Sequence, residues 1–86
     1  MLFDSEIQAP EGWEVVHIQT GAAPRDEVAE LMAQIQDTGL KVSMEAGYIV
    51  VTKEGNSLAV RAFEDGVVPD LNTRGFRTTW RHLGGI

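Results

Sequence analysis

Residues 24–53 decide the fold, and they read PRDEVAELMAQIQDTGLKVSMEAGYIVVTK. The first half carries apolar residues at the i, i+3, i+4 and i+7 spacing of one helical face. They are Val28, Leu31, Met32 and Ile35. Pro24 suits the first helical position, and Gly39 suits the left-handed position after the last turn. The pattern predicts a helix from Pro24 to Thr38 with one side against a core.

Two strands are expected directly after this helix. Residues Leu40–Glu45 alternate between apolar and polar, and Tyr48–Lys53 is rich in β-branched residues. Ala46-Gly47 between them suits a turn, so the pair is predicted to be antiparallel. A further strand is expected before the helix at Trp13–Gln19, with Val16 and Ile18 on one face. Trp13, Val15 and His17 are expected on the other face.

The chain after this pair alternates once more. Leu58, Val60 and Ala62 fall on one side of Leu58–Phe63, between turn signals at Glu54–Ser57 and Asp65-Gly66. This pattern predicts the third strand of a meander. The expected fold class is α+β: a small antiparallel sheet in β-α-β-β-β order, with one amphipathic helix packed on one face.

A single domain over residues 1–86 is expected, with a lead-in at 1–12 and a basic, aromatic C-terminal segment at 67–86. Pro69 excludes a central strand at its position. In residues 76–83, a helix would place Phe76, Trp80 and Leu83 on one face, whereas Thr78-Thr79 favours a strand. We expect the strand. The predicted core is Val16, Ile18, Val28, Leu31, Met32, Ile35, Leu40, Val42, Ile49, Val51, Leu58 and Val60.

The charge is divided unevenly along the 86 residues. The whole chain has 13 acidic and 7 basic residues, a net charge of −6. Residues 1–70 hold all 13 acids and 4 bases, a net charge of −9, and residues 71–86 hold three arginines and no acid. An acidic body therefore precedes a basic tail. A hydrophobic fraction of 43% is that of a globular protein, and zero cysteines exclude disulfides and thiolate chemistry.

No targeting or membrane segment is expected. The chain starts without the positive, then apolar, pattern of a secretory signal. Its longest apolar run, Tyr48–Val51, is far below the ~20 residues that a membrane helix needs. The sequence therefore predicts a cytoplasmic protein.

Catalytic chemistry finds little support in the sequence. His17 has no acidic residue at a same-face spacing, and His82 lies among arginines. Acidic residues at Glu64, Asp65 and Asp70 lie close together but match no calcium-loop pattern. No phosphate-binding glycine motif occurs, and the first turn of the predicted helix is acidic, which opposes anion binding near Gly21. We expect no enzyme activity, no cofactor and no metal.

The C-terminal segment is the strongest candidate for a binding surface. The candidate residues are Arg74, Phe76, Arg77, Trp80 and Arg81. Three interpretations stay open, in this order. In the first, Phe76 and Trp80 pack on the protein's own body while the arginines pair with its acidic surface. In the second, Trp and Arg anchor a protein interface. In the third, the aromatics stack on nucleic-acid bases while the arginines contact phosphates, against repulsion from the acidic body.

The acidic body has two interpretations of its own. The acidic residues concerned are Asp4, Glu6, Glu11, Glu14, Glu27, Glu30 and Asp37. They either keep the protein soluble or imitate a phosphate backbone and occupy a basic nucleic-acid-binding site. So small a core also favours a homodimer or a partner-bound form.

The function expected from the sequence is therefore that of a small, acidic, non-enzymatic interaction protein. Such domains are typical of accessory or inhibitory proteins, including those of phages and mobile elements. The expected partner is a protein, and nucleic-acid binding through the C-terminal segment is the alternative. No membrane contact is expected.

Overall fold

The structure is a computed structural model that describes residues 9–82. In this range the elements are β1 (Val15–Gln19), α1 (Arg25–Thr38), β2 (Lys41–Glu45), β3 (Tyr48–Thr52), α2 (Ser57–Ala62), the π-helical turn η1 (Phe63–Val67), α3 (Val68–Arg74) and β4 (Arg77–Arg81). Most of the predicted lead-in, together with Leu83, lies outside the described residues.

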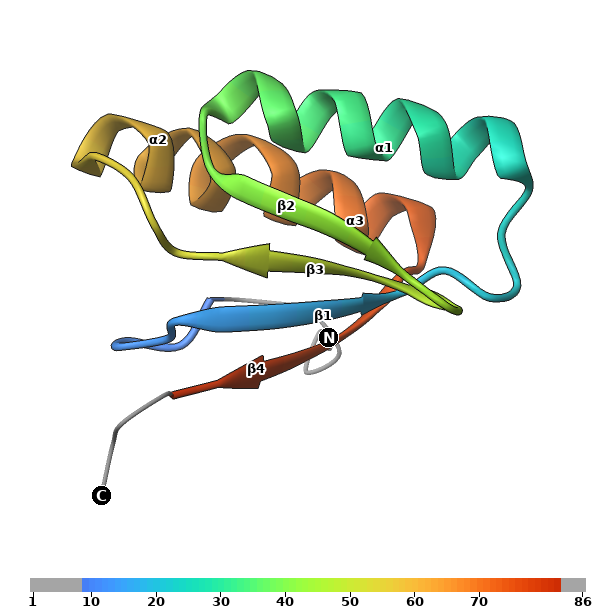
Figure 1. Ribbon diagram of the computed structural model, residues 1–86, viewed down its shortest axis with the longest axis horizontal. Coiled ribbons are helices and arrows are strands. Elements are labelled where there is room, and N and C mark those ends of the chain that lie inside the picture. The colour runs from blue at the N-terminus through green and yellow to red at the C-terminus, as the bar shows by residue number, and fades with distance from the viewer. Residues whose placement is uncertain (1–8, 83–86) are drawn as a thin grey trace, which may run out of the picture.

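The four strands form one antiparallel sheet in the order β2-β3-β1-β4, so β2 and β4 are its edges. Figure 1 shows α1 and the run from α2 to α3 on the same side of this sheet, where together they form one helical layer. The predicted α+β class, with an antiparallel sheet and a helix packed on one face, is confirmed. The observed β-α-β-β-α-β order is the ferredoxin-like arrangement. It supports many unrelated functions and assigns none.

The predicted helix at 24–38 is confirmed as α1. Pro24 precedes its first residue, and Asp26 and Glu27 occupy the first turn, where the helix dipole favours negative charge. Gly39 ends the helix at φ 96°, a left-handed conformation that glycine adopts without strain, and its N–H donates to the carbonyl of Gln36.

The prediction of a third meander strand at Leu58–Phe63 is wrong, because this segment opens a helical run from Ser57 to Arg74. The buried residues of the run recur every four positions: Ala59, Phe63, Val67 and Leu71. Leu58, expected in the core, is 76% exposed. The short alternation at 58–62 also fits a helix. The turn expected at Asp65-Gly66 ended the segment too early for the four-residue repeat of a helix to be recognised.

Three local features explain why a helix forms here. The side chain of Asn56 accepts a hydrogen bond from the N–H of Ala59 (2.8 Å), which caps the start. The wide turn η1 then lets the N–H of Val68 reach the carbonyl of Phe63, directly before Pro69, which has no N–H to donate. Gly75, at φ 79°, ends the run and releases the chain into β4.

The core lies between the sheet and the helices. Eight predicted core residues are fully buried there: Val16, Ile18, Val28, Leu31, Ile35, Leu40, Ile49 and Val51. Met32, Val42 and Val60 are partly buried against it. The buried residues that sequence reasoning missed come from the helical run and from the two chain segments beside it: Trp13, Ala59, Phe63, Val67, Val68, Leu71 and Phe76.

Trp13, Phe63 and Trp80 form an aromatic cluster that joins β4 to the helical run. The ring centroids of Trp13 and Trp80 are 5.0 Å apart, and those of Trp13 and Phe63 are 5.6 Å apart. The indole N–H of Trp13 donates to a carboxylate oxygen of Glu64 at 2.7 Å. The expectation that Trp13 shares a face with Val15 is wrong, because the strand ladder begins after it, at Glu14, which bonds to both neighbouring strands.

Within residues 9–82, none of the helices combines the length and the apolar character that crossing a lipid bilayer requires.

Candidate functional site: the helix-free face of the sheet

We call the face of the sheet that no helix of residues 9–82 covers the open face. Since side chains alternate along a strand, the odd-numbered residues of β1, β2 and β4 share this face with the even-numbered residues of β3. It consists of Val15, His17, Gln19, Lys41, Ser43, Glu45, Tyr48, Val50, Thr52, Arg77, Thr79 and Arg81.

The centre of the open face is apolar and aromatic. His17 on β1 and Tyr48 on β3 meet edge to face, with ring centroids 5.2 Å apart and planes at 84°. Both side chains are half-buried, as is Val50, which lies opposite His17 in the register. Val15 on the same face is 8% exposed. The two central strands therefore present a compact patch that is poorly solvated compared with its surroundings.

The rim of the open face is polar and mostly cationic. Arg77 and Arg81 are exposed on β4, on either side of Thr79 and about 13 Å apart along the strand. Lys41 lies on the opposite edge, where its Nζ is 3.9 Å from Glu54 Oε1. That ion pair is two-thirds exposed and contributes little to stability. Glu45 is the one acidic residue of the open face.

The helical layer carries the opposite charge. Its seven acidic residues are Asp26, Glu27, Glu30, Asp37, Glu64, Asp65 and Asp70. Three arginines, Arg25, Arg61 and Arg74, oppose them. The division of charge seen along the sequence is therefore also a division between the two layers of the fold. A ligand on the open face meets arginines first, with the acidic layer behind the sheet.

The five predicted site residues do not form one surface. Arg77 and Arg81 lie on the open face, whereas Phe76 and Trp80 face the helices. Phe76 is 7% exposed and Trp80 packs against the core, so the aromatic half of the first interpretation is confirmed, whereas the pairing of the arginines with the acidic surface stays a prediction. Arg74 is exposed near the end of α3. Because arginines and aromatic residues alternate in the sequence, the strand places the arginines on the open face and the aromatic residues on the helix-covered face.

The other acidic side chains singled out in the sequence either accept hydrogen bonds within the protein or lie on separate segments. Glu64 accepts from Trp13, and Asp70 accepts from the side-chain amide of Gln34 at 2.7 Å. In the described part of the chain, no three His, Asp or Glu side chains gather as metal ligands would. Of the predicted acidic surface, Glu27, Glu30 and Asp37 lie on α1. Glu11 and Glu14 precede β1, and Asp4 and Glu6 lie outside the described residues.

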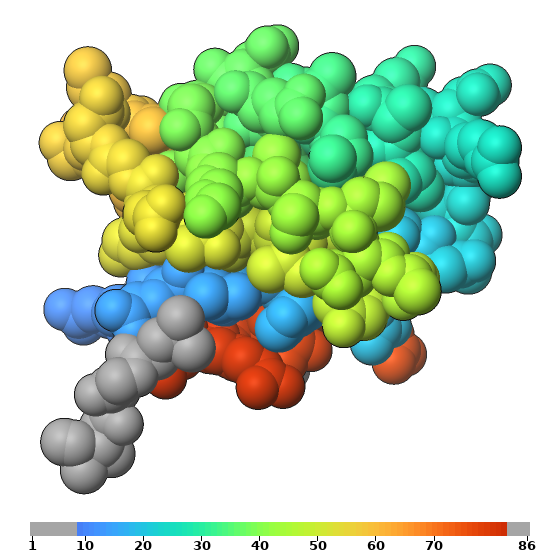
Figure 2. All heavy atoms as spheres, viewed as in Figure 1, coloured from blue at the N-terminus to red at the C-terminus, as the bar shows by residue number. Residues whose placement is uncertain are grey.

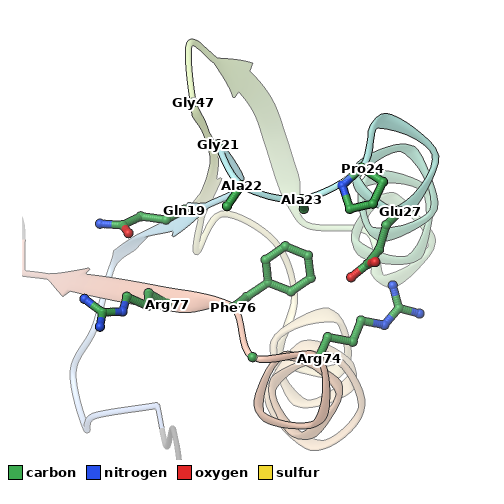
Figure 3. Close-up of a pocket in the computed structure, with 11 residues that line it drawn as sticks. Gln19, Gly21, Ala22, Ala23, Pro24, Glu27, Gly47, Arg74, Phe76 and Arg77 are labelled. Atoms are coloured by element: carbon green, nitrogen blue, oxygen red, sulfur yellow. The ribbon is translucent and has the colours of Figure 1, made fainter.

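A cavity of about 620 Å³ lies at the end of the sheet, between the β1–α1 loop and the start of β4. In Figure 3 the ring of Phe76 points into it, and Glu27 and Arg74 point toward each other at its far side. Arg77 and Gln19 point away from that ring, toward the open face. The charged residues that line the cavity are Glu27, Arg74 and Arg77.

Sequence reasoning missed the patch formed by His17 and Tyr48. His17 was singled out only as a catalytic candidate, and Tyr48 only as part of a strand. Their contact depends on the antiparallel register of β1 with β3, which places Tyr48 opposite Gln19, two residues from His17. An alternation pattern indicates which side chains share a face but not how two strands are aligned. The sequence alone therefore does not show that His17 contacts Tyr48.

No protein-family model, curated protein or solved structure matches this chain.

Proposed function

We propose that the protein is a non-enzymatic interaction domain that binds an acidic segment of a partner protein on its open face. The observation that carries the proposal is the arrangement of this face, with an apolar, aromatic centre and exposed arginines at its rim. Protein interfaces commonly have this anatomy, and Tyr and Arg are among the residues that contribute most binding energy.

A protein partner fits this face better than a nucleic acid does. The two aromatics expected to stack on bases, Phe76 and Trp80, face the core, which leaves the half-buried Tyr48 and His17 for stacking. Lys41 is already paired with Glu54, so Arg77 and Arg81 supply most of the attraction, and two arginines suit a short acidic segment. A long polyanion would extend past them toward a body of strongly negative charge.

The non-enzymatic part of the proposal rests on His17. Its ring packs against Tyr48, and it makes no hydrogen bond to a carboxylate within residues 9–82. A histidine that acts as a general base is usually oriented by such a partner and lies within reach of a nucleophile.

The test uses a photo-reactive amino acid at Thr79, an exposed position between the two arginines of the open face. A matched site at Ala33, exposed on α1, serves as the control. After irradiation in the cells that express the protein, we expect a protein adduct at position 79 and none at position 33. Adducts of equal yield at both positions, or an adduct at 79 that nuclease removes, would overturn the proposal.

The role of the arginines is tested by charge reversal. The double variant Arg77→Glu/Arg81→Glu changes the open face, and Arg25→Glu/Arg61→Glu makes the same change in net charge on the helical layer. We expect the first variant to lose the adduct at position 79 and the second to keep it. Equal losses in both variants would show that net charge, and not the open face, determines binding.

A further inference from the structure

The edge strand β2 has a sequence that is complementary to itself when reversed. It reads Lys41-Val42-Ser43-Met44-Glu45. If two copies run antiparallel about Ser43, each Lys41 lies opposite Glu45 of the second copy, and each Val42 lies opposite Met44 of the second copy. Opposite charges face each other at both ends, and apolar side chains face each other between them, which are favourable cross-strand pairs.

The free backbone groups of β2 fit the same register. The N–H of Thr20 donates to the carbonyl of Gly47, and the N–H of Lys53 donates to the carbonyl of Glu14. The odd-numbered residues of β3 therefore bond to β1, and its even-numbered residues bond to β2. Those even-numbered residues pair with Lys41, Ser43 and Glu45.

It follows that Val42 and Met44 direct their N–H and C=O groups away from β3, toward the free edge. The reversed register places these two residues opposite each other, so two copies can form four backbone hydrogen bonds across the two-fold axis. Ser43 faces its own counterpart at a non-hydrogen-bonded position, where the two Cα atoms are about 4.5 Å apart.

The surroundings of β2 leave room for a second strand. Four of its five residues are exposed, and Met44, on the side of the sheet that carries the helices, is 51% exposed. In Figure 2 the green atoms of this part of the chain lie at the surface. The other edge strand, β4, opposes the same arrangement, because antiparallel pairing about Thr79 would place Arg77 opposite Arg81 of the second copy.

We propose that the protein forms a symmetric homodimer in which β2 pairs with β2 of a second copy, centred on Ser43. The two sheets become one sheet of eight strands, and the open faces stay uncovered. Two paired edges of five residues bury less than the roughly 1,200 Å² of a stable interface. We therefore expect a dissociation constant in the micromolar range or weaker.

The first experiment is a charge swap measured by analytical ultracentrifugation from micromolar to millimolar concentration. In the Lys41→Glu variant both end pairs become acidic, and in the Glu45→Lys variant both become basic. We expect each variant alone to dimerise about tenfold or more weakly than the wild type. A mixture of the two restores opposite charges at both ends, so a heterodimer of wild-type strength is expected. Glu30→Lys, an exposed change on α1, should leave the constant unchanged.

The second experiment uses the absence of cysteine from the chain. Ser43→Cys places two thiols across the two-fold axis at a Cα separation that a disulfide spans. Thr79→Cys is the matched control at the centre of the other edge strand. Mild oxidation should give a covalent dimer for the first variant and not for the second.

The following results would overturn the proposal. They are a wild-type protein that stays monomeric up to millimolar concentration, a dimer whose strength does not respond to the charge swap, or equal cross-linking at positions 43 and 79. Because the dimer is tested on β2 and the adduct is measured on β4, at the other edge of the sheet, a monomeric protein that still forms an adduct at Thr79 refutes the dimer alone. A dimer without such an adduct leaves the dimer standing and refutes the proposed function.

Discussion

The replacement Phe63→Ala tests the helical run most directly. The side chain of Phe63 is fully buried, and its ring contacts those of Trp13 at 5.6 Å and Trp80 at 6.4 Å. Truncating a buried phenylalanine to alanine destabilises a protein by about 3–5 kcal/mol. The loss of two aromatic contacts places this site in the upper half of that range, at about 4–5 kcal/mol. Leu58→Ala in the same helical run removes a side chain that is 76% exposed, and should change stability by less than about 0.5 kcal/mol.

The assay is urea unfolding at 25 °C, followed by circular dichroism and by tryptophan fluorescence. Both tryptophans contact Phe63, so emission reports on the same cluster. In thermal unfolding, a loss of about 4 kcal/mol corresponds to a fall of roughly 16 °C or more in the melting temperature. If Phe63→Ala does not fold, Phe63→Leu, with an expected loss below about 1.5 kcal/mol, keeps the comparison measurable. A larger loss for Leu58→Ala than for the Phe63 variants would refute the helix and favour the meander strand.

Four further predictions concern local structure. Asn56→Ala removes the cap of α2 and should lower the unfolding free energy by about 1 kcal/mol, whereas an unchanged urea midpoint would show that the cap contributes nothing. Gly66→Ala should raise that free energy by about 0.5–1 kcal/mol, because Gly66 lies inside the helical run with open space around it. Gly39→Ala should lower it by a similar amount, since φ is +96° there, and changes of equal sign at the two glycines would contradict one of the two assignments. In a double-mutant cycle, Trp13→Phe and Glu64→Ala should show a coupling of at least about 0.5 kcal/mol, and additive losses would mean that their hydrogen bond is not formed in solution.

The elements that sequence reasoning predicted correctly are those whose local signals agree. α1 has an apolar repeat over two turns, an acidic first turn and a glycine after its end. The hairpin of β2 and β3 has alternation before Gly47, a glycine with positive φ, and a run rich in β-branched residues after it. Where capping, periodicity and turn chemistry point to one structure, a single sequence is enough to identify the element.

In the helical run from Ser57 to Arg74 the local sequence signals disagree with one another. Its four-residue repeat passes through Gly66 and Pro69, and both residues ordinarily mark a break. The wide turn η1 accommodates them, and its Phe63 and Val67 are buried in the core. The first six residues alone satisfy a strand pattern as well as a helical pattern, so the shorter window favoured the wrong element.

The candidate site was predictable only in part. A strand at residues 77–81 already implies that Arg77 and Arg81 share a face and that Trp80 points the other way. Which of these two faces is covered depends on where the helical run from Ser57 to Arg74 lies, and this run was not predicted from the sequence. The contact between His17 and Tyr48 required the register of two strands separated by a helix and a hairpin.

The paired form of the protein would change what the open face can bind. In a sheet of eight strands the two β4 strands are seven spacings, or about 34 Å, apart. Each carries its own Arg77 and Arg81 on the same uncovered face. An acidic partner with two binding segments that can span this distance would gain avidity without any new contact, whereas a single short segment would not.

The arginines of β4 also affect the behaviour of concentrated solutions. A sheet with two free edges can add strands without limit, which is the route to fibres and gels. In the proposed dimer, repulsion between the arginines of the two β4 edges would oppose further growth, so association through β2 would stop at two chains. Because this barrier is electrostatic and exposed, it weakens as the Debye length falls from about 10 Å at 0.1 M salt to about 3 Å at 1 M. If the proposed dimer forms, we therefore expect pairs at low ionic strength and longer assemblies at high ionic strength.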